Sequence, residues 1–170
     1  MTTTAFPFAD TSLVHFRHAY LREHGTTRRI LSAFPAEQKD FKPAERANSA
    51  QALAWTFVLE EAMLLKTIRG EQVLGSGFGK PPDSWEAVLQ AFDAQHEEIL
   101  AALDAVQGEL TNTVKFPAGP GRMADYPAME FAWFMLCDQI HHRGQLSVYV
   151  RIVGGKLPSI YGPSGDEPWT

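Results

Sequence analysis

Residues 141–169 read HHRGQLSVYVRIVGGKLPSIYGPSGDEPW and carry the strongest structural signal in the chain. A helix-forming segment that starts with two adjacent histidines ends at Gly154 and Gly155, and a tail rich in Pro and Gly follows. Adjacent residues on a helix are rotated by about 100° around its axis, so His141 and His142 cannot face the same side. The stretch therefore raises the question of which histidine faces inward and which groups it meets.

The composition is that of an ordinary globular protein with a single domain spanning residues 1–170. Its 170 residues are 45% hydrophobic and 21% charged, which is enough apolar material for a sizeable core. The net charge of −5 argues against nucleic acid as the principal partner, because phosphate binding requires a concentrated basic surface.

The expected location is the cytoplasm. Cys137 is the single cysteine, so an intramolecular disulfide cannot form and a reducing compartment is the simplest interpretation. Residues 1–9 (MTTTAFPFA) lack the basic and apolar regions of a signal peptide. No apolar run approaches the roughly 20 residues of a membrane span, so no membrane partner is expected.

Four helical segments are predicted, separated by breaks that contain Pro and Gly. The fold class expected from them is an all-α four-helix bundle, in which sites are built from facing helices. Asn48, with Gln51, and Asp83, with Glu86, are the predicted caps of the second and third helices. A turn at 75–82 and a hairpin-like insert around 118–121 interrupt the bundle. The predicted helices run from about Thr11 to Ala33, from Asn48 to Gly70, from Asp83 to Leu110 and from Pro127 to Val153.

The periodicity of the fourth helix predicts its inward face. Arg143 and Arg151 lie opposite a stripe centred on Asp138, so we expect the stripe to face the core and the arginines to face solvent. His142 is then the inward histidine and His141 lies at the edge of the stripe. The stripe consists of Phe131, Phe134, Asp138, His142, Gln145, Tyr149 and Ile152.

Asp138 and His142, one turn apart on this face, need partners because burying an unpaired polar group costs a few kcal/mol. In one interpretation, Asp138 accepts a hydrogen bond from His142 and the pair is structural. In the other, both are metal ligands, since a carboxylate oxygen and an imidazole nitrogen at this spacing can reach one ion. The spacing alone favours the structural interpretation.

The run HHRGQL, the glycine break and the tail PSIYGPSGDE together resemble the C-terminal signature of the DinB-like superfamily. The layout of the helices, with LAWTFVLEEAMLL in the second, agrees with this resemblance over nearly the whole chain. It implies a four-helix bundle of up-down-down-up type with an ordered C-terminal tail, often found as a homodimer.

The resemblance also implies a divalent metal such as nickel or zinc, held by three histidines. One comes from the second helix and two from an H-x-x-x-H on the fourth. Carried over by position, these ligands fall on Thr56, Asp138 and His142, so only one of the three is histidine here.

The site could be rebuilt with Glu60, which lies one turn after Thr56. A Glu60–Asp138–His142 set contains two carboxylates and suits Mn, Fe or Mg better than a soft ion. A metal-free cluster of Thr56, Asp138 and His142 remains the preferred interpretation over a bound Ni, Zn, Mn or Fe ion. The residues predicted to line an adjoining pocket are Thr56, His141, Gln145 and Tyr149.

Two functions follow from the resemblance, and the sequence leaves open whether the protein is an enzyme. The first is a metal-assisted transferase that uses a low-molecular-weight thiol, with the metal holding the thiolate. The second is a non-catalytic bundle that has lost the metal and serves as a ligand-binding or stress-related protein.

The remaining candidates receive structural interpretations. Arg143 is expected to anchor the tail through Asp166 or Glu167, and Gly144 to permit close packing of helices. Cys137 is expected to be inert. His15 and His18 are expected to lie at the surface, and no partners are recognised for His24 or His96.

Overall fold

Serine side chains begin three of the four helices in the computed structural model, which describes residues 12–74 and 79–169. Ser12, Ser49 and Ser84 each accept a hydrogen bond from a backbone N–H three residues later. The helices are α1 (Leu13–Ala33), α2 (Ala50–Arg69), α3 (Trp85–Ala105) and α4 (Ala128–Ile152). The predicted start at Thr11, the N-terminal segment 1–9 and residues 75–78 of the predicted turn lie outside the described residues.

The predicted caps at Asn48 and Asp83 are each wrong by one position, because the following serine has the extended backbone and the bond. The predicted end of the third helix at Leu110 is also wrong. Val106 leaves the helical conformation and Gly108 adopts a positive φ of 88°, so α3 ends at Ala105. At the end of α2, Gly70 has the predicted left-handed conformation, with φ 71°.

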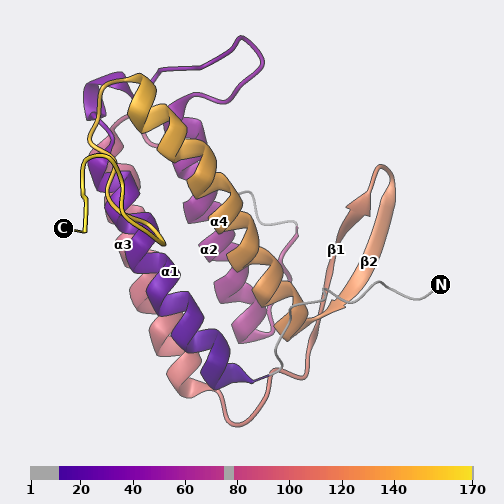
Figure 1. The fold of residues 1–170 in the computed structure, drawn as a ribbon. Coiled ribbons are helices and arrows are strands. Elements are labelled where there is room, and N and C mark those ends of the chain that lie inside the picture. Colours follow the sequence, from indigo (N-terminus) through magenta and orange to yellow (C-terminus); the bar gives the residue numbers. More distant parts are fainter. Residues whose placement is uncertain (1–11, 75–78, 170) are drawn as a thin grey trace.

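The core of the bundle consists of two apolar clusters, and their membership gives the direction of each helix. The first cluster joins the C-terminal halves of α1 and α4 to the N-terminal halves of α2 and α3, and the second joins the opposite halves. Helices α1 and α4 therefore run one way and α2 and α3 the other, which is the up-down-down-up order (Figure 1). Members of the first cluster include Phe34, Leu53, Trp85, Phe92 and Val150, and members of the second include Phe16, Leu64, Ile99, Phe131 and Met135.

Polar side chains separate the two clusters near the middle of the helices. On α2, for example, Glu60 and Glu61 follow the residues of the first cluster and precede those of the second. We call this band the central polar layer. It comprises the buried Glu23, His24, Glu60, Glu61, Gln139 and Arg143 and the half-buried His96, Asp138 and His142.

A β-hairpin precedes α4 and projects away from one end of the bundle (Figure 1). Strands β1 (Thr113–Gly119) and β2 (Arg122–Pro127) pair antiparallel, with Val114 opposite Tyr126. The predicted hairpin-like insert is confirmed, but the all-α class is corrected to a mostly helical fold with a two-stranded sheet. In the described part of the chain, no helix combines the length and the apolar character that crossing a membrane requires.

The C-terminal tail packs on α1 and α4 through ion pairs. Arg29 of α1 holds Glu167, with 2.6 Å between nitrogen and oxygen, and Arg151 of α4 holds Asp166. Arg143 does reach the tail, but it contacts the hydroxyl of Tyr161, so its predicted pairing with Asp166 or Glu167 is wrong. In Figure 1 the tail runs along the outside of α1.

Candidate metal centre

Glu60 of α2 faces Asp138 and His142 of α4 across the central polar layer. One donor atom from each residue lies within 4.8 Å of the other two, so the three form a group that could hold a metal ion. The contact between the helices is direct, because His142 Nδ1 lies 2.7 Å from Glu60 Oε1. The partner of His142 is therefore Glu60, and not Asp138 as the structural interpretation predicted.

Burial and neighbouring charge control the protonation of this group. Burial raises the pKa of Glu60 to about 8, against the lowering effect of His142 and with a further rise from the Asp138 carboxylate. The hydrogen bond to Glu60 raises the pKa of His142, although burial opposes it. Protons therefore compete with a cation for Glu60 and His142, and a cation that binds there must displace them.

The donor set fits a hard divalent cation. Glu60 is 1% exposed, and its second carboxylate oxygen, Oε2, has no hydrogen-bond partner. An orphaned buried carboxylate oxygen costs free energy that a bound cation would recover. Two carboxylates and one imidazole from two helices match the donor preference of Mn²⁺ or Fe²⁺.

Thr56 lies one turn before Glu60 and makes a different contact. Its hydroxyl donates to the carbonyl oxygen of Ala52, 3.2 Å away on the same helix. The contribution of α2 to the candidate centre thus comes from Glu60, not from the position on which the resemblance places a histidine.

The other residues predicted to line a pocket point in separate directions. His141 and Gln145 are exposed and bond to each other, with 2.9 Å between their Nε2 atoms. Tyr149 is buried, and its hydroxyl donates to the carbonyl oxygen of Asn48 at the start of α2. A pocket shared by these residues with Thr56 stays a prediction.

The predicted inward face of α4 is wrong in part. Arg143 is 1% exposed, whereas Gln145 and Ile152 of the predicted stripe are exposed. Helix α4 packs on both α1 and α2, so its buried surface is wider than one stripe: Asp138 and His142 face α2, and Arg143 faces α1. Arg143 donates to Glu23 at 2.7 Å.

Gly144 is exposed, and a Cβ there would meet nothing within 4 Å, so its predicted packing role is also wrong.

Cys137 has the properties of an inert thiol. Burial, followed by the charges of Glu23 and Asp138, raises its pKa, so the thiolate is disfavoured. His15 and His18 are exposed on α1, as predicted. None of these three side chains belongs to the candidate metal centre.

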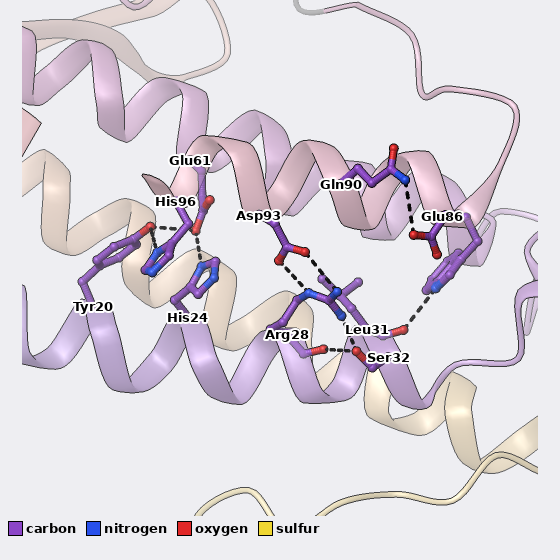
Figure 2. Close-up of polar contacts among 11 residues, drawn as sticks. Tyr20, His24, Arg28, Leu31, Ser32, Glu61, Glu86, Gln90, Asp93 and His96 are labelled. Carbon is purple, nitrogen blue, oxygen red and sulfur yellow. Dashed lines mark hydrogen bonds and ion pairs between the residues drawn. The ribbon is translucent and has the colours of Figure 1, made fainter. Parts of the chain in front are cut away.

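A second polar cluster joins residues of this layer to Tyr20, and the sequence did not predict it. Tyr20 and His24 of α1, Glu61 of α2 and His96 of α3 form a connected set of hydrogen bonds and ring contacts (Figure 2). The sequence shows no partners for His24 or His96, because most of their partners lie on other helices. The available signal was the one-turn spacing of Tyr20 and His24 within an apolar helix face.

Comparison with known proteins agrees with this fold. The DinB family matches residues 1–169 of the chain. Two solved structures are similar in fold: a DinB-like protein from Bacillus cereus ATCC 10987 (TM-score 0.73, 20% identity, 89% of this chain and 99% of that chain covered) and a DinB-like protein from Bacillus subtilis (TM-score 0.64, 19% identity, 92% and 99% covered). Among curated proteins, no sequence matches this chain significantly.

Proposed function

Because the chain belongs to the DinB family, we propose that it is a metal-dependent member of the family in which Glu60, Asp138 and His142 hold a divalent cation. The observation that carries the proposal is the buried Glu60 carboxylate, whose Oε2 has no partner although two further donor groups face it. The ligand set favours Mn²⁺ or Fe²⁺ over the softer Ni²⁺ and Zn²⁺ of a three-histidine site.

The finer proposal is a transferase that acts on a low-molecular-weight thiol. A bound cation would supply Lewis acidity that stabilises the thiol as its thiolate, the nucleophile of the transfer. The chain's own residues supply the position of the site: the Glu60–His142 contact fixes the imidazole, and burial of Glu60 keeps bulk water from one side of the centre. A cytoplasmic homodimer is part of the same proposal.

One observation favours a non-catalytic bundle as the second candidate. The 2.7 Å contact between His142 and Glu60 already satisfies one polar atom of each side chain without a metal. In that function the layer would be a structural or ligand-binding feature, and the protein would hold no stoichiometric cation.

Metal content distinguishes the two functions. The protein is prepared without a histidine tag, incubated with Mn²⁺, Fe²⁺, Ni²⁺ or Zn²⁺, and the retained metal is measured after gel filtration. We expect about one ion per chain, with a preference for Mn²⁺ or Fe²⁺, and a loss of at least tenfold in affinity for Glu60→Gln and His142→Ala.

Glu45→Gln is the matched control, because Glu45 is an exposed carboxylate in the loop before α2. Failure of the unmodified protein to retain any of the four ions would overturn the metal proposal and favour the second candidate. The double change Thr56→His with Asp138→His is a further test: restored nickel or zinc binding would indicate that the family's three-histidine geometry is still present.

A further inference from the structure

The imidazole of His24 connects three helices in the central polar layer. It stacks on Phe92 and on His96, two α3 side chains one turn apart, with ring centroids 4.4 Å and 3.6 Å away. The planes of His24 and His96 differ by 12°, so the two imidazoles lie face to face. Its Nδ1 lies 2.9 Å from Glu61 Oε1 of α2. His24 is thus a principal contact between α1 and the α2–α3 pair.

The contacts drawn in Figure 2 are all satisfied by the following arrangement of protons. The Tyr20 hydroxyl donates to Glu61 Oε1 at 3.1 Å, so its oxygen accepts from His96 Nδ1, 2.9 Å away. Glu61 Oε1 also accepts from Nδ1 of His24. Both imidazoles therefore carry their proton on Nδ1 when neutral, and Nε2 is the position at which each would gain a charge.

We propose that the stacked pair His24–His96 is an acid-sensitive latch, which holds α1 against α3 while both rings are neutral and releases it when they gain protons. Two imidazolium rings at 3.6 Å would place like charges face to face in a site with little water. A single charge on His24 is also unfavourable, since the ring is buried against Phe92.

The charged groups around the pair do not cancel this cost. Arg28, one turn along α1, disfavours a charge on His24, whereas Asp93 and Glu97 of α3 favour it. The charge on α4 that packs against this part of α1 is Arg143, which is already paired with Glu23. Glu61 faces the pair from α2, with Oε1 2.9 Å from His24 Nδ1. Burial raises the pKa of Glu61 well above its ordinary value, so the side chain is a neutral acid and offers His24 no counter-charge.

The direction of the pH effect follows from the difference in histidine pKa between the closed and the open state. Burial lowers the pKa of both His24 and His96 to about 4, below the ordinary value of 6.5. The open state therefore takes up protons as the pH falls from 6.5 to 4, and acid favours opening. Each histidine can raise the opening equilibrium constant by up to about tenfold per pH unit in that window.

Opening would be local, because ion pairs hold α1 on α3 on either side of the latch. Arg28 bonds to Asp93 through two nitrogens, at 2.6 Å and 3.0 Å, and Arg17 lies 3.1 Å from Asp104. The segment of α1 expected to separate from α3 is therefore the one around residues 20–27, which stays on α4 through Glu23 and Arg143.

Hydrogen exchange tests the latch. Amide protection in α1, corrected for the intrinsic pH dependence of exchange, is measured between pH 7 and pH 4.5. We expect protection around residues 20–27 to fall at least tenfold between pH 6.5 and pH 5. The side-chain amide in His96→Gln can still donate to Tyr20 but cannot be charged. In this variant the fall in amide protection should be at most half as large as in the unmodified protein.

His18→Gln is the control, because His18 is an exposed histidine on the same helix; its profile should match that of the unmodified protein. Protection that is independent of pH, or an unchanged fall in His96→Gln, would overturn the proposal. Should His96→Gln fold poorly at pH 7, an NMR titration of the unmodified protein decides: pKa values near 6.5 for both His24 and His96 would contradict the latch.

Discussion

Arg143 and Glu23 form a buried ion pair that crosses from α4 to α1. The guanidinium also donates to the Thr27 hydroxyl and to the carbonyl oxygen of Glu23, so most of its donors have partners. Burial would raise the pKa of Glu23, but the hydrogen bonds from Tyr161 and Arg143 hold it below the ordinary value. The pair therefore stays ionised inside the bundle at neutral pH.

Breaking this pair should strongly destabilise the fold. We expect Arg143→Met to lower the free energy of unfolding by about 3–5 kcal/mol, because it leaves the Glu23 carboxylate buried without its counter-ion. Urea unfolding followed by circular dichroism measures the change. Arg151→Met removes the more exposed pair with Asp166 and should cost about 1 kcal/mol or less. Equal effects of the two substitutions would contradict the importance of burial.

The sequence could not reveal this pair. Helical periodicity places Arg143 opposite the apolar stripe, and an arginine opposite such a stripe is normally solvated. Its burial depends on Glu23, which lies 120 positions earlier in the chain.

The candidate metal centre was more accessible from the sequence. Helical periodicity and the family resemblance together indicated Glu60, Asp138 and His142, because each lies one turn from another candidate on its own helix.

Helix ends are the elements in which local sequence has the clearest structural effect. At the starts of α2 and α3, two residues capable of capping stand side by side, and the serine nearer the helix makes the bond in both cases. A pattern of residue types cannot choose between neighbours, because the choice depends on where the backbone turns from extended to helical.

At the end of α4, Gly155 packs against the end of α1. A Cβ on this residue would lie 2.8 Å from Val150 Cγ1 and 2.9 Å from the carbonyl oxygen of Ala33.

Two glycines of the same signature should respond to alanine in opposite ways. Gly155→Ala should lower the free energy of unfolding by about 1–3 kcal/mol, because backbone and a buried valine must move. Gly144→Ala lies in mid-helix with open space around it and should raise stability by about 0.5–1 kcal/mol. Thermal unfolding of the two variants measures both changes. Destabilisation by Gly144→Ala would indicate a contact that the exposed position does not make within the chain.

At the scale of the whole molecule, the central polar layer divides one bundle into two apolar clusters. All four helices pass through both clusters, so neither cluster can lose its structure without affecting the elements of the other. The hydrogen bonds of the layer, such as those of Glu61 with Tyr20 and His24, join separate helices between the clusters. We therefore expect the bundle to unfold as one unit.

Leu53 and Leu64 test this cooperativity, since both are buried on α2 but lie in different clusters. Leu53→Ala and Leu64→Ala should each cost about 2–5 kcal/mol and leave a single urea transition with an unchanged slope. Hydrogen exchange at both ends of α2 should report the same loss in each variant. Two separate transitions would show that the clusters unfold independently.

The helices and the hairpin could be predicted from the sequence more fully than the polar contacts inside the bundle. The spacing of apolar residues and the glycine breaks gave four helices in nearly their observed ranges, and the hairpin followed from the Gly-Pro-Gly turn. The spacing of Tyr20 and His24 indicated only the α1 half of their cluster. Its contacts with Glu61 and His96 depend on the relative rotation of three helices, which the periodicity of a single helix does not determine.

The hairpin has an additional consequence for colloidal behaviour. A two-stranded sheet has an open edge on each side, and such edges can template intermolecular strand addition and aggregation. In β1, Pro117 lacks a backbone N–H, and the register shifts between Pro117 and Gly119, so the row of donors along that strand is interrupted. Charged side chains at Lys115, Arg122 and Asp125 further oppose lateral pairing. The hairpin can therefore extend into solvent without acting as a seed for fibrillar association.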